Sequence, residues 1–292
     1  MRVGKLVRSI FLLTLHLVFF STVACTVPTP TPAALDIKAI LDRYLQNLPD
    51  GWGTITPEAL SKQLETSKPF LVDVREPKEI ADAGFIANSM NIPIRTFVKN
   101  LDRLPAKNQP IVLICSSGHR SALAMEALQL LGYSNVKSLV GGISAWKAAN
   151  LPVATGAPLE GKAGQALDVD PQLLAALDKY FAKLPDGWNL MTPAVLNDIL
   201  KNSQPFQLEV REVKEIADAG SIAYSTNIPI RTLIHNLDQL PPDRGAPIIV
   251  ECGNGHKSAM SMMALNLLGY TNTKSLAGGL SAWTKAGLPV SK

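Results

Sequence analysis

The chain has 292 residues, a length that favours about two domains of ~150 residues each. Hydrophobic residues make up 47% and charged residues 18%, which excludes an intrinsically disordered chain and provides enough apolar side chain for a core in each half. The formal net charge of +4 includes Arg2, Lys5 and Arg8 near the N-terminus, and without these three it is +1. The charge therefore indicates neither a nucleic-acid-binding protein nor a polybasic membrane binder.

The first 24 residues have the layout of an export signal. Three basic residues precede the apolar stretch IFLLTLHLVFF of 11 residues, which is shorter than the ~20 residues of a membrane-spanning helix. The stretch ends in STVAC, which resembles the lipobox of bacterial lipoproteins. The resemblance implies a signal peptide over 1–24, lipidation of Cys25, and anchoring at the outer face of the bacterial cytoplasmic membrane.

Two alternatives to lipidation stay open. One is a plain secretory signal cut after Ala24, which would give a periplasmic or extracellular protein, and the other is an uncleaved anchor. In each case residues 25–36, rich in proline and threonine, predict an extended tether before the folded part of the chain.

The chain from residue 37 onward contains two copies of one domain. VREPKEIADAG is repeated as VREVKEIADAG, NIPIRTFVKNLDRLP as NIPIRTLIHNLDQLP, and LGYSNVKSLVGGISAW as LGYTNTKSLAGGLSAW. Arg75 corresponds to Arg211, 136 residues later, and Cys115 to Cys252, 137 residues later. A repeat of this length is a whole domain and not a solenoid unit. We predict one domain over 37–155, a linker rich in glycine and alanine over 156–169, and a second domain over 170–292.

Strand and helix patterns alternate within each copy. In the first copy PFLVDVR, PIVLIC and VKSLV are apolar runs of strand length, and PEALSKQLETS, SALAMEALQLLGY and ISAWKAAN have helical patterns. This alternation predicts an α/β fold of two tandem domains, each with a central parallel sheet flanked by helices. Ligands of such sheets bind outside the carboxyl ends of the strands, which is where Cys115 falls.

The sequence CSSGHRS, residues 115–121, joins a strand end to a helix start that we expect at Ser121. Gly118 can take a positive φ, so a tight loop can turn backbone N–H groups inward as an anion-binding nest, and the helix adds its positive end. Cys115 beside such a nest favours its nucleophilic thiolate, and Arg120 adds a planar cationic fork for an oxyanion. The alternative is a cysteine that only packs, but these features within seven residues favour a nucleophile.

The segments LVDVREPKEI, NIPI, CSSGHRS and GGISAW, with their counterparts in the second copy, resemble the rhodanese domain. The resemblance implies sulfurtransferase chemistry, in which a loop cysteine takes the outer sulfur of thiosulfate or a similar donor and passes it from a persulfide to cyanide or a thiol. It also implies that Asp73 and Arg75 brace the loop from below. Related phosphatases place five residues between cysteine and arginine, whereas this loop has the four residues SSGH, which argues against phosphatase activity.

The residues expected to contact the donor are the loop residues around the two cysteines. In the first copy they are Ser116, Ser117, Gly118, His119, Arg120 and Ser121, and in the second Gly253, Asn254, Gly255, His256 and Lys257. His119 is expected as a loop residue or a contact to the incoming anion, because an ionised thiol needs no separate base.

The second loop, CGNGHKS, differs from the first at three places that predict a weaker site. Lys257 carries charge without the fork of an arginine. Glu209 replaces Asp73 with a longer arm beside Arg211, which shifts the brace. Glu251 would raise the pKa of the Cys252 thiol if it faced the site, although alternation along a strand can equally turn it away. We therefore expect Cys115 to be the main nucleophile and Cys252 a weaker or differently selective one.

Apart from Cys25, each domain has a single cysteine, so neither can form an internal disulfide, and a bridge between the domains is the remaining alternative. We expect no cofactor and no metal, because the four histidines are scattered and neither copy pairs two cysteines at ligand spacing. The expected partners are a small anionic sulfur donor, a thiol or cyanide acceptor, and the membrane through the lipid anchor, with no nucleic acid. Two other functions stay open: a persulfide carrier or sulfur-binding module with little small-molecule turnover, and an interaction domain without sulfur transfer.

Overall fold

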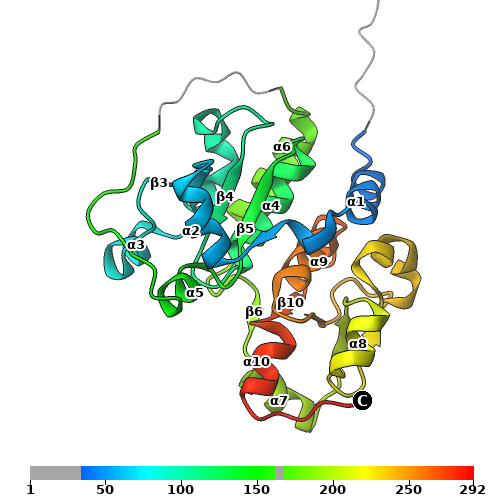
Figure 1. Ribbon diagram of the computed structural model, residues 1–292. Helices are drawn as coiled ribbons and strands as arrows, with labels where there is room; N and C mark the ends of the chain where they lie inside the picture. The colour runs from blue at the N-terminus through cyan, green and yellow to red at the C-terminus, as the bar shows by residue number, and fades with distance from the viewer. Residues whose placement is uncertain (1–33, 162–167) are drawn as a thin grey trace, which may run out of the picture. The chain divides into compact units, whose positions relative to one another are not determined.

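The computed structural model describes residues 34–161 and 168–292. The predicted signal peptide, Cys25 and most of the predicted tether lie outside the described residues, as does part of the linker, 162–167. Each repeat forms a five-stranded sheet with helices packed on it (Figure 1). The predicted α/β fold of two tandem domains is thereby confirmed. Over the described ranges, no helix is long and apolar enough to cross a membrane.

The two repeats contain the same elements in the same order, except that the 3₁₀ helix Asp50–Gly53 has no counterpart among the described elements of the second repeat. The first consists of α1 (Ile37–Gln46), the 3₁₀ helix η1 (Asp50–Gly53), β1 (Thr54–Ile55), α2 (Pro57–Glu65), β2 (Phe70–Asp73), α3 (Pro77–Ala83), β3 (Ser89–Asn91), the 3₁₀ helix η2 (Ile94–Arg103), β4 (Ile111–Ile114), α4 (His119–Leu130), β5 (Val136–Leu139) and α5 (Gly142–Ala148). The second consists of α6 (Pro171–Ala182), β6 (Leu190–Met191), α7 (Pro193–Asn202), β7 (Phe206–Glu209), α8 (Val213–Ala219), β8 (Thr226–Asn227), the 3₁₀ helix η3 (Ile230–Gln239), β9 (Ile248–Glu251), α9 (His256–Leu267), β10 (Thr273–Leu276) and α10 (Gly279–Lys285).

The strands of both sheets run parallel. Their orders are β1-β5-β4-β2-β3 and β6-β10-β9-β7-β8. The predicted strands correspond to β2, β4 and β5, and the predicted helices to α2, α4 and α5. β4 is buried at each of its four residues, which explains its unbroken apolar sequence, because a central parallel strand is covered on both faces. This arrangement brings the carboxyl ends of β2 and β4, and with them Asp73 and Cys115, to one edge of the sheet.

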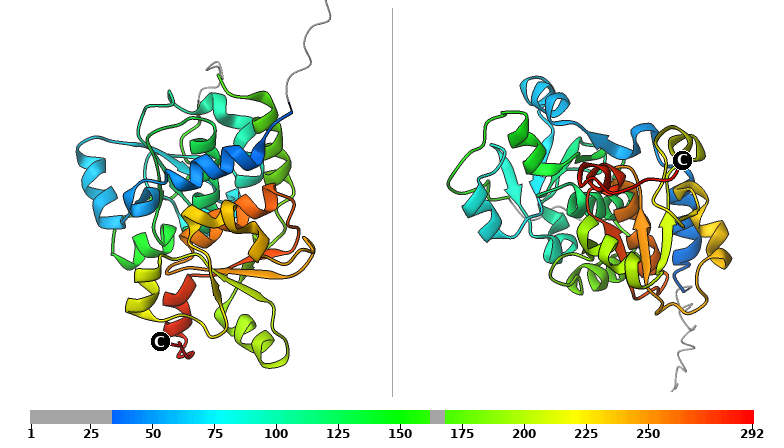
Figure 2. Two further views of the ribbon diagram at one scale, coloured as in Figure 1. Left: turned by 90° about the vertical axis from the view of Figure 1, so that its right-hand side faces the viewer. Right: turned by 90° about the horizontal axis from the view of Figure 1, so that it is seen from below.

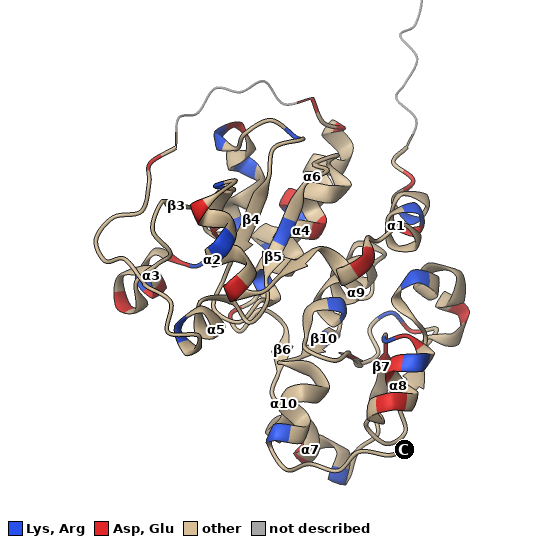
Figure 3. Cartoon of the chain, viewed as in Figure 1, with Lys and Arg blue, Asp and Glu red and all other residues tan. Residues whose placement is uncertain are grey.

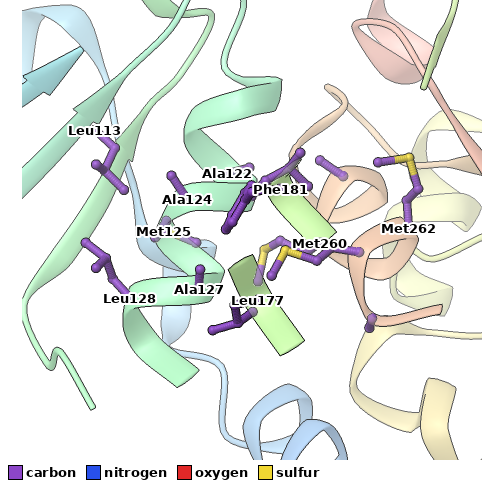
Figure 4. Packing of buried hydrophobic residues seen from close by; sticks show 14 of the residues in the cluster. Leu113, Ala122, Ala124, Met125, Ala127, Leu128, Leu177, Phe181, Met260 and Met262 are labelled. Carbon is purple, nitrogen blue, oxygen red and sulfur yellow. The ribbon is translucent and has the colours of Figure 1, made fainter. Parts of the chain in front are cut away.

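The helices α4 and α9 pack against each other and so join the two repeats. α4 is buried without a break from His119 to Leu128, because one side covers its own sheet and the other side meets the second repeat. A helix that is buried on every side needs such a position between two packed layers. Figure 4 shows Met125 of α4, Phe181 of α6 and Met260 of α9 gathered in this common core.

The first helix of each repeat packs on the other repeat. The blue α1 lies beside the gold η3 in Figures 1 and 2, and α6 packs in the same way on η2. Arg95 of η2 donates through Nε to the carbonyl of Leu184 at 3.1 Å, and Arg231 of η3 donates through Nη1 to the carbonyl of Gln46 at 2.9 Å. The chain therefore crosses between the repeats twice, once after α1 and once after α6.

Candidate active site

Cys115 follows β4, and the loop after it leads into α4 at His119. The helix begins two residues earlier than the predicted start at Ser121, because Gly118 at φ 95° forms its N-cap. The N–H of Gly118 donates to Cys115 Sγ at 3.1 Å, and Ser121 Oγ lies 3.5 Å from the same sulfur. The cysteine is 1% exposed. An N–H donor and the positive end of a helix both favour the charged form of a thiol.

The glycine pair after β5 holds this loop from behind. The N–H groups of Ile143 and Ser144 donate to the carbonyls of Cys115 and Ser116 at 2.8 and 3.2 Å. Gly142 approaches so closely, at φ 56°, that a Cβ there would lie 2.1 Å from the Cys115 carbonyl oxygen. The carbonyl groups of the loop thus point toward α5 and away from the thiol. These contacts fix the curvature of the loop.

Arg120, whose guanidinium was predicted to bind an oxyanion, forms an ion pair with Glu79 of α3. Its Nη1 and Nη2 each donate to a Glu79 carboxylate oxygen at 2.6 Å, and Nη2 also donates to Ser116 Oγ at 2.9 Å. Ser116 Oγ in turn donates to Glu79 Oε1 at 2.8 Å. Burial would raise the pKa of Glu79, but hydrogen bonds from Arg120, the Glu76 backbone and Ser116 lower it to about 2. The rim of the loop is therefore a closed, charged network in which Glu79 is ionised.

Asp73 and Arg75 form a buried ion pair below the loop. Arg75 Nη2 lies 2.6 Å from Asp73 Oδ2, and its Nε donates to Asp73 Oδ1 at 2.9 Å. The same guanidinium donates to the carbonyls of Gly84 and Glu79 at 2.8 and 3.4 Å. Glu79 lies in α3 and Gly84 is its C-cap. The ion pair therefore fixes the position of the helix that carries Glu79, the ion-pair partner of Arg120. A brace on the loop thus passes through α3.

The second loop repeats the thiol geometry with Cys252, which is 0% exposed. Its Sγ accepts from the N–H groups of Gly255 and Ser258 at 3.2 and 3.3 Å. The rim is simpler, because Lys257 Nζ makes one contact of 2.5 Å to Glu215 of α8 and glycine stands where the first loop has Ser116. Figure 3 shows acidic and basic residues interspersed along α8. The pKa of Glu215 is lowered, since bonds from Lys257 and the Glu212 backbone outweigh its burial.

The brace of the second repeat is also weaker. Arg211 Nη2 lies 2.7 Å from Glu209 Oε2 and donates to the Gly220 carbonyl at 2.7 Å. Its buried Nε has no hydrogen-bond partner among the described residues, whereas the Nε of Arg75 donates to Asp73. The extra methylene of a glutamate accounts for this loss, because the carboxylate no longer meets the guanidinium edge in two places.

Glu251 lies on the face of β9 that points away from Cys252. Ile248 and Val250 pack in the same core as Cys252, while Ile249 packs on the opposite face with Trp283, and alternation puts Glu251 with Ile249. Burial and the neighbouring Glu209 raise the pKa of Glu251 well above its usual value. Because Glu251 lies on the far face of β9, its carboxyl group is not placed beside the Cys252 thiol.

Each loop histidine binds a tryptophan backbone of the other repeat. His119 Nε2 lies 3.0 Å from the carbonyl oxygen of Trp188, and His256 Nε2 lies 2.9 Å from that of Trp52. A carbonyl only accepts, so Nε2 carries the proton in both rings. Burial lowers the pKa of both histidines to about 4, and the bonds to the tryptophan carbonyls oppose this only in part. Both rings are neutral near pH 7.

Comparison with known proteins identifies the family. Residues 56–149 and 192–286 each match the Rhodanese-like domain. The chain belongs to the rhodanese-like domain family. The two matches cover more than half of its length, one in each repeat, so its rhodanese-like domains stand in tandem.

Several relatives of the rhodanese-like domains carry sulfurtransferase names. A sulfurtransferase of Allochromatium vinosum is 38% identical over 100 residues, 34% of this chain and 92% of that protein. An uncharacterized protein of Synechocystis is 36% identical over 100 residues, and the match spans 54% of that protein. The solved structure of a 3-mercaptopyruvate sulfotransferase from Escherichia coli covers 78% of this chain and 98% of its own, at 15% identity and TM-score 0.39. The relative from Allochromatium vinosum supports a general function in sulfur transfer.

Within both rhodanese-like domains, the structure brings together the predicted loop residues and their predicted braces. Ser117 and Asn254 lie at the exposed tips of the loops, and the remaining loop side chains are buried or half-buried. Sequence reasoning missed the partners of these residues. They are Glu79 and Glu215 on the rim, and Trp52 and Trp188, whose carbonyls bind the histidines. The signal was present as the repeated VRE-x-KE and LPDGW segments, in which an acid and an aromatic residue recur in both copies. Among the described residues, no cluster of three metal-ligating side chains is found.

Proposed function

We propose that this protein is a thiosulfate sulfurtransferase of the rhodanese type, with Cys115 as its main sulfur carrier. The observation that carries the proposal is the 3.1 Å contact from the Gly118 N–H to Cys115 Sγ at the start of α4. Both features stabilise a thiolate, which is the form that attacks another sulfur. The sulfurtransferase relative from Allochromatium vinosum supports the same chemistry.

The reaction has two half-steps that share the Cys115 sulfur. In the first, the thiolate attacks the sulfane sulfur of thiosulfate, a new S–S bond forms, and sulfite leaves with the electron pair of the broken S–S bond. In the second, cyanide or a thiolate attacks the outer sulfur of the persulfide and leaves as thiocyanate or a new persulfide, which restores the Cys115 thiolate. Neither step needs a proton from His119, which is neutral and engaged with Trp188.

The second site supports the same chemistry at lower efficiency. Its thiol accepts hydrogen bonds from two backbone N–H groups. However, Lys257 has a single contact to Glu215, and the Arg211 guanidinium contacts Glu209 through Nη2. A loop whose rim and brace make fewer contacts holds its hydrogen-bond donors in a less fixed geometry. Positioning of such donors is a large part of catalysis. We infer that Cys252 turns over more slowly than Cys115.

A persulfide carrier with little small-molecule turnover is the second candidate. Two observations favour this function. Both Nη groups of Arg120 already donate to Glu79, and Nη2 also donates to Ser116, so the guanidinium is occupied. In addition, Cys115 is 1% exposed. A carrier of this kind accepts sulfur from a partner protein and not from a free anion.

The intact mass of the purified protein after incubation with thiosulfate tests the first proposal. We expect a gain of about 32 Da, one sulfur atom, that disappears in Cys115→Ser and remains in the matched control Cys252→Ser. Thiocyanate production on adding cyanide then separates the enzyme from the carrier. A gain without turnover supports the carrier, and no gain in any variant removes thiosulfate as the donor.

We also propose that the mature protein is held at the outer face of the cytoplasmic membrane by lipid on Cys25. The support is the sequence STVAC after a short apolar stretch. Cys25→Ala should move the protein from the membrane fraction to the soluble fraction after export. An unchanged distribution would contradict the lipid anchor.

A further inference from the structure

Each thiol-bearing loop is covered by a tryptophan that the other repeat supplies. The Trp188 ring, from the segment between α6 and β6, lies over the Arg120 guanidinium, whose Cζ is 4.6 Å from the ring centroid. Arg95 Cζ lies 4.3 Å from the same ring. The carbonyl of Trp188 accepts from His119, so this residue contacts the first loop through both its backbone and its side chain. A cation over an indole ring is the strongest form of cation–π contact.

The second site has the reciprocal arrangement. The Trp52 ring lies 4.2 Å from Lys257 Nζ and 4.9 Å from Arg231 Cζ, measured to the ring centroid. Its carbonyl accepts from His256. Trp52 and Trp188 have φ values of 59° and 58°, a left-handed conformation that is costly for a bulky side chain. The same cost at both corresponding positions indicates that the tertiary contacts of the two tryptophans hold them there.

The exchanged helices place these tryptophans. α6 packs on η2 and α1 on η3, so each of these helices lies on the other repeat, and the LPDGW segment that follows it leads back to its own sheet. Arg95 ties one crossing in place, with Nη2 at 2.8 Å from Asp186 Oδ1 and Nε donating to the Leu184 carbonyl. The cover of each loop is thus part of the interface between the repeats.

We propose that Trp188 is the specificity-determining residue of the Cys115 site, and Trp52 that of the Cys252 site, each acting as a size filter supplied by the opposite repeat. This inference rests on the proposed sulfur-transfer function, since it concerns which donors are admitted. Glu79 and Ser116 engage the edge of the Arg120 guanidinium and Trp188 its face, while Cys115 is 1% exposed. A small inorganic donor such as thiosulfate passes beside the ring, whereas a bulky organic persulfide must displace it.

Site-resolved thiol modification tests the cover without requiring any sulfur transfer. In the full chain, peptide mapping follows Cys115 and Cys252 separately after reaction with iodoacetamide, a small reagent, and with 5,5′-dithiobis(2-nitrobenzoate), a bulky one. Trp188→Ala should raise the rate of the bulky reagent at Cys115 about tenfold, the change expected when cation–π contacts on the ring are lost, with a smaller rise for iodoacetamide. Cys252 should change less than about twofold, since additive effects are expected at separate sites.

The matched variant Trp52→Ala should give the mirror image, with the rise at Cys252. Trp188→Phe keeps an aromatic cover and should stay near the wild-type rate. Arg95→Gln removes a cation from the Trp188 ring together with the ion pairs of Arg95 to Asp186 and Glu76, and it leaves every loop residue unchanged. It should give a smaller rise at Cys115 alone, so it provides a second test if Trp188→Ala fails to fold. A rise at both cysteines in either tryptophan variant, or at neither, would overturn the assignment.

Donor selectivity provides the functional readout. Loading of Cys115 by thiosulfate and by glutathione persulfide is measured by mass in wild type and in Trp188→Ala. The ratio of the thiosulfate rate to the glutathione persulfide rate should fall about tenfold in the variant, and an unchanged ratio would refute the role in specificity. If modification shows the cover but wild-type protein is not loaded by thiosulfate, the cover stands and the proposed donor is wrong.

Discussion

Replacing Glu79 by glutamine isolates the charge that holds the rim of the first loop. The substitution keeps the size and an acceptor oxygen of the side chain, but it leaves Arg120 facing a neutral group. Arg120 is 4% exposed, and Glu79 receives both of its Nη groups at 2.6 Å. A buried guanidinium that loses its ionised partner is destabilising. We therefore expect Glu79→Gln to lower the free energy of unfolding and to loosen the loop.

The size of the effect follows from the pKa of Glu79. A fall from 4.5 to about 2 corresponds to about 3 kcal/mol of preference for the ionised form in the folded state. The Glu79 side chain is 35% exposed, so solvent screening reduces this figure, and we expect a loss of about 1–2 kcal/mol near neutral pH.

The pH dependence separates charge from packing. Because the folded-state pKa lies below the unfolded value, the ionised carboxyl contributes its full stability above about pH 4.5 and loses it as the pH falls toward 2. Urea unfolding of wild type and Glu79→Gln should therefore differ most near neutral pH and converge as the pH falls. The matched control Glu215→Gln should show a smaller deficit, because Lys257 makes a single contact there. A deficit of Glu79→Gln that stays constant from pH 7 to about pH 3 would refute the electrostatic explanation.

Three further predictions concern the loops and the buried carboxyl. Gly142→Ala should cost about 2 kcal/mol or more in urea unfolding, because a Cβ would meet the Cys115 carbonyl oxygen at 2.1 Å; Gly156→Ala, also at positive φ but in open space, should cost less, and equal losses would contradict the steric argument. Glu251→Ile should stabilise the protein by about 1–3 kcal/mol at neutral pH. Because burial raises the folded-state pKa of Glu251 well above its usual value of 4.5, the cost of its ionised form falls as the pH drops from the raised pKa toward about 4.5 and is absent below that pH. The gain should therefore shrink over that range and stay level at lower pH, and a loss at every pH would contradict this. Cys252→Ser should keep most thiosulfate turnover and Cys115→Ser should remove it; the reverse result would make the second repeat the main site.

The local features of this protein follow from its amino-acid sequence. The apolar run PIVLIC predicted β4, and the glycine of CSSGHRS predicted the positive φ at which α4 begins. Each depends on burial periodicity or on steric limits over a few neighbouring residues, which are written directly in the chain. The duplication likewise predicted two sheets with a cysteine at the end of a central strand in each.

The surroundings of the two thiols depend on contacts between segments that are distant in the chain. Arg120 has the cationic fork that the sequence predicted, but its partner Glu79 lies 41 residues away, and His119 meets Trp188 from the other repeat, 69 residues away. The face of Glu251 also depended on how β9 is set in its sheet, which the sequence left open. Periodicity states which residues are buried and not which distant segments meet, because loop closure over such separations depends weakly on length and the choice of partner depends on packing of the whole core.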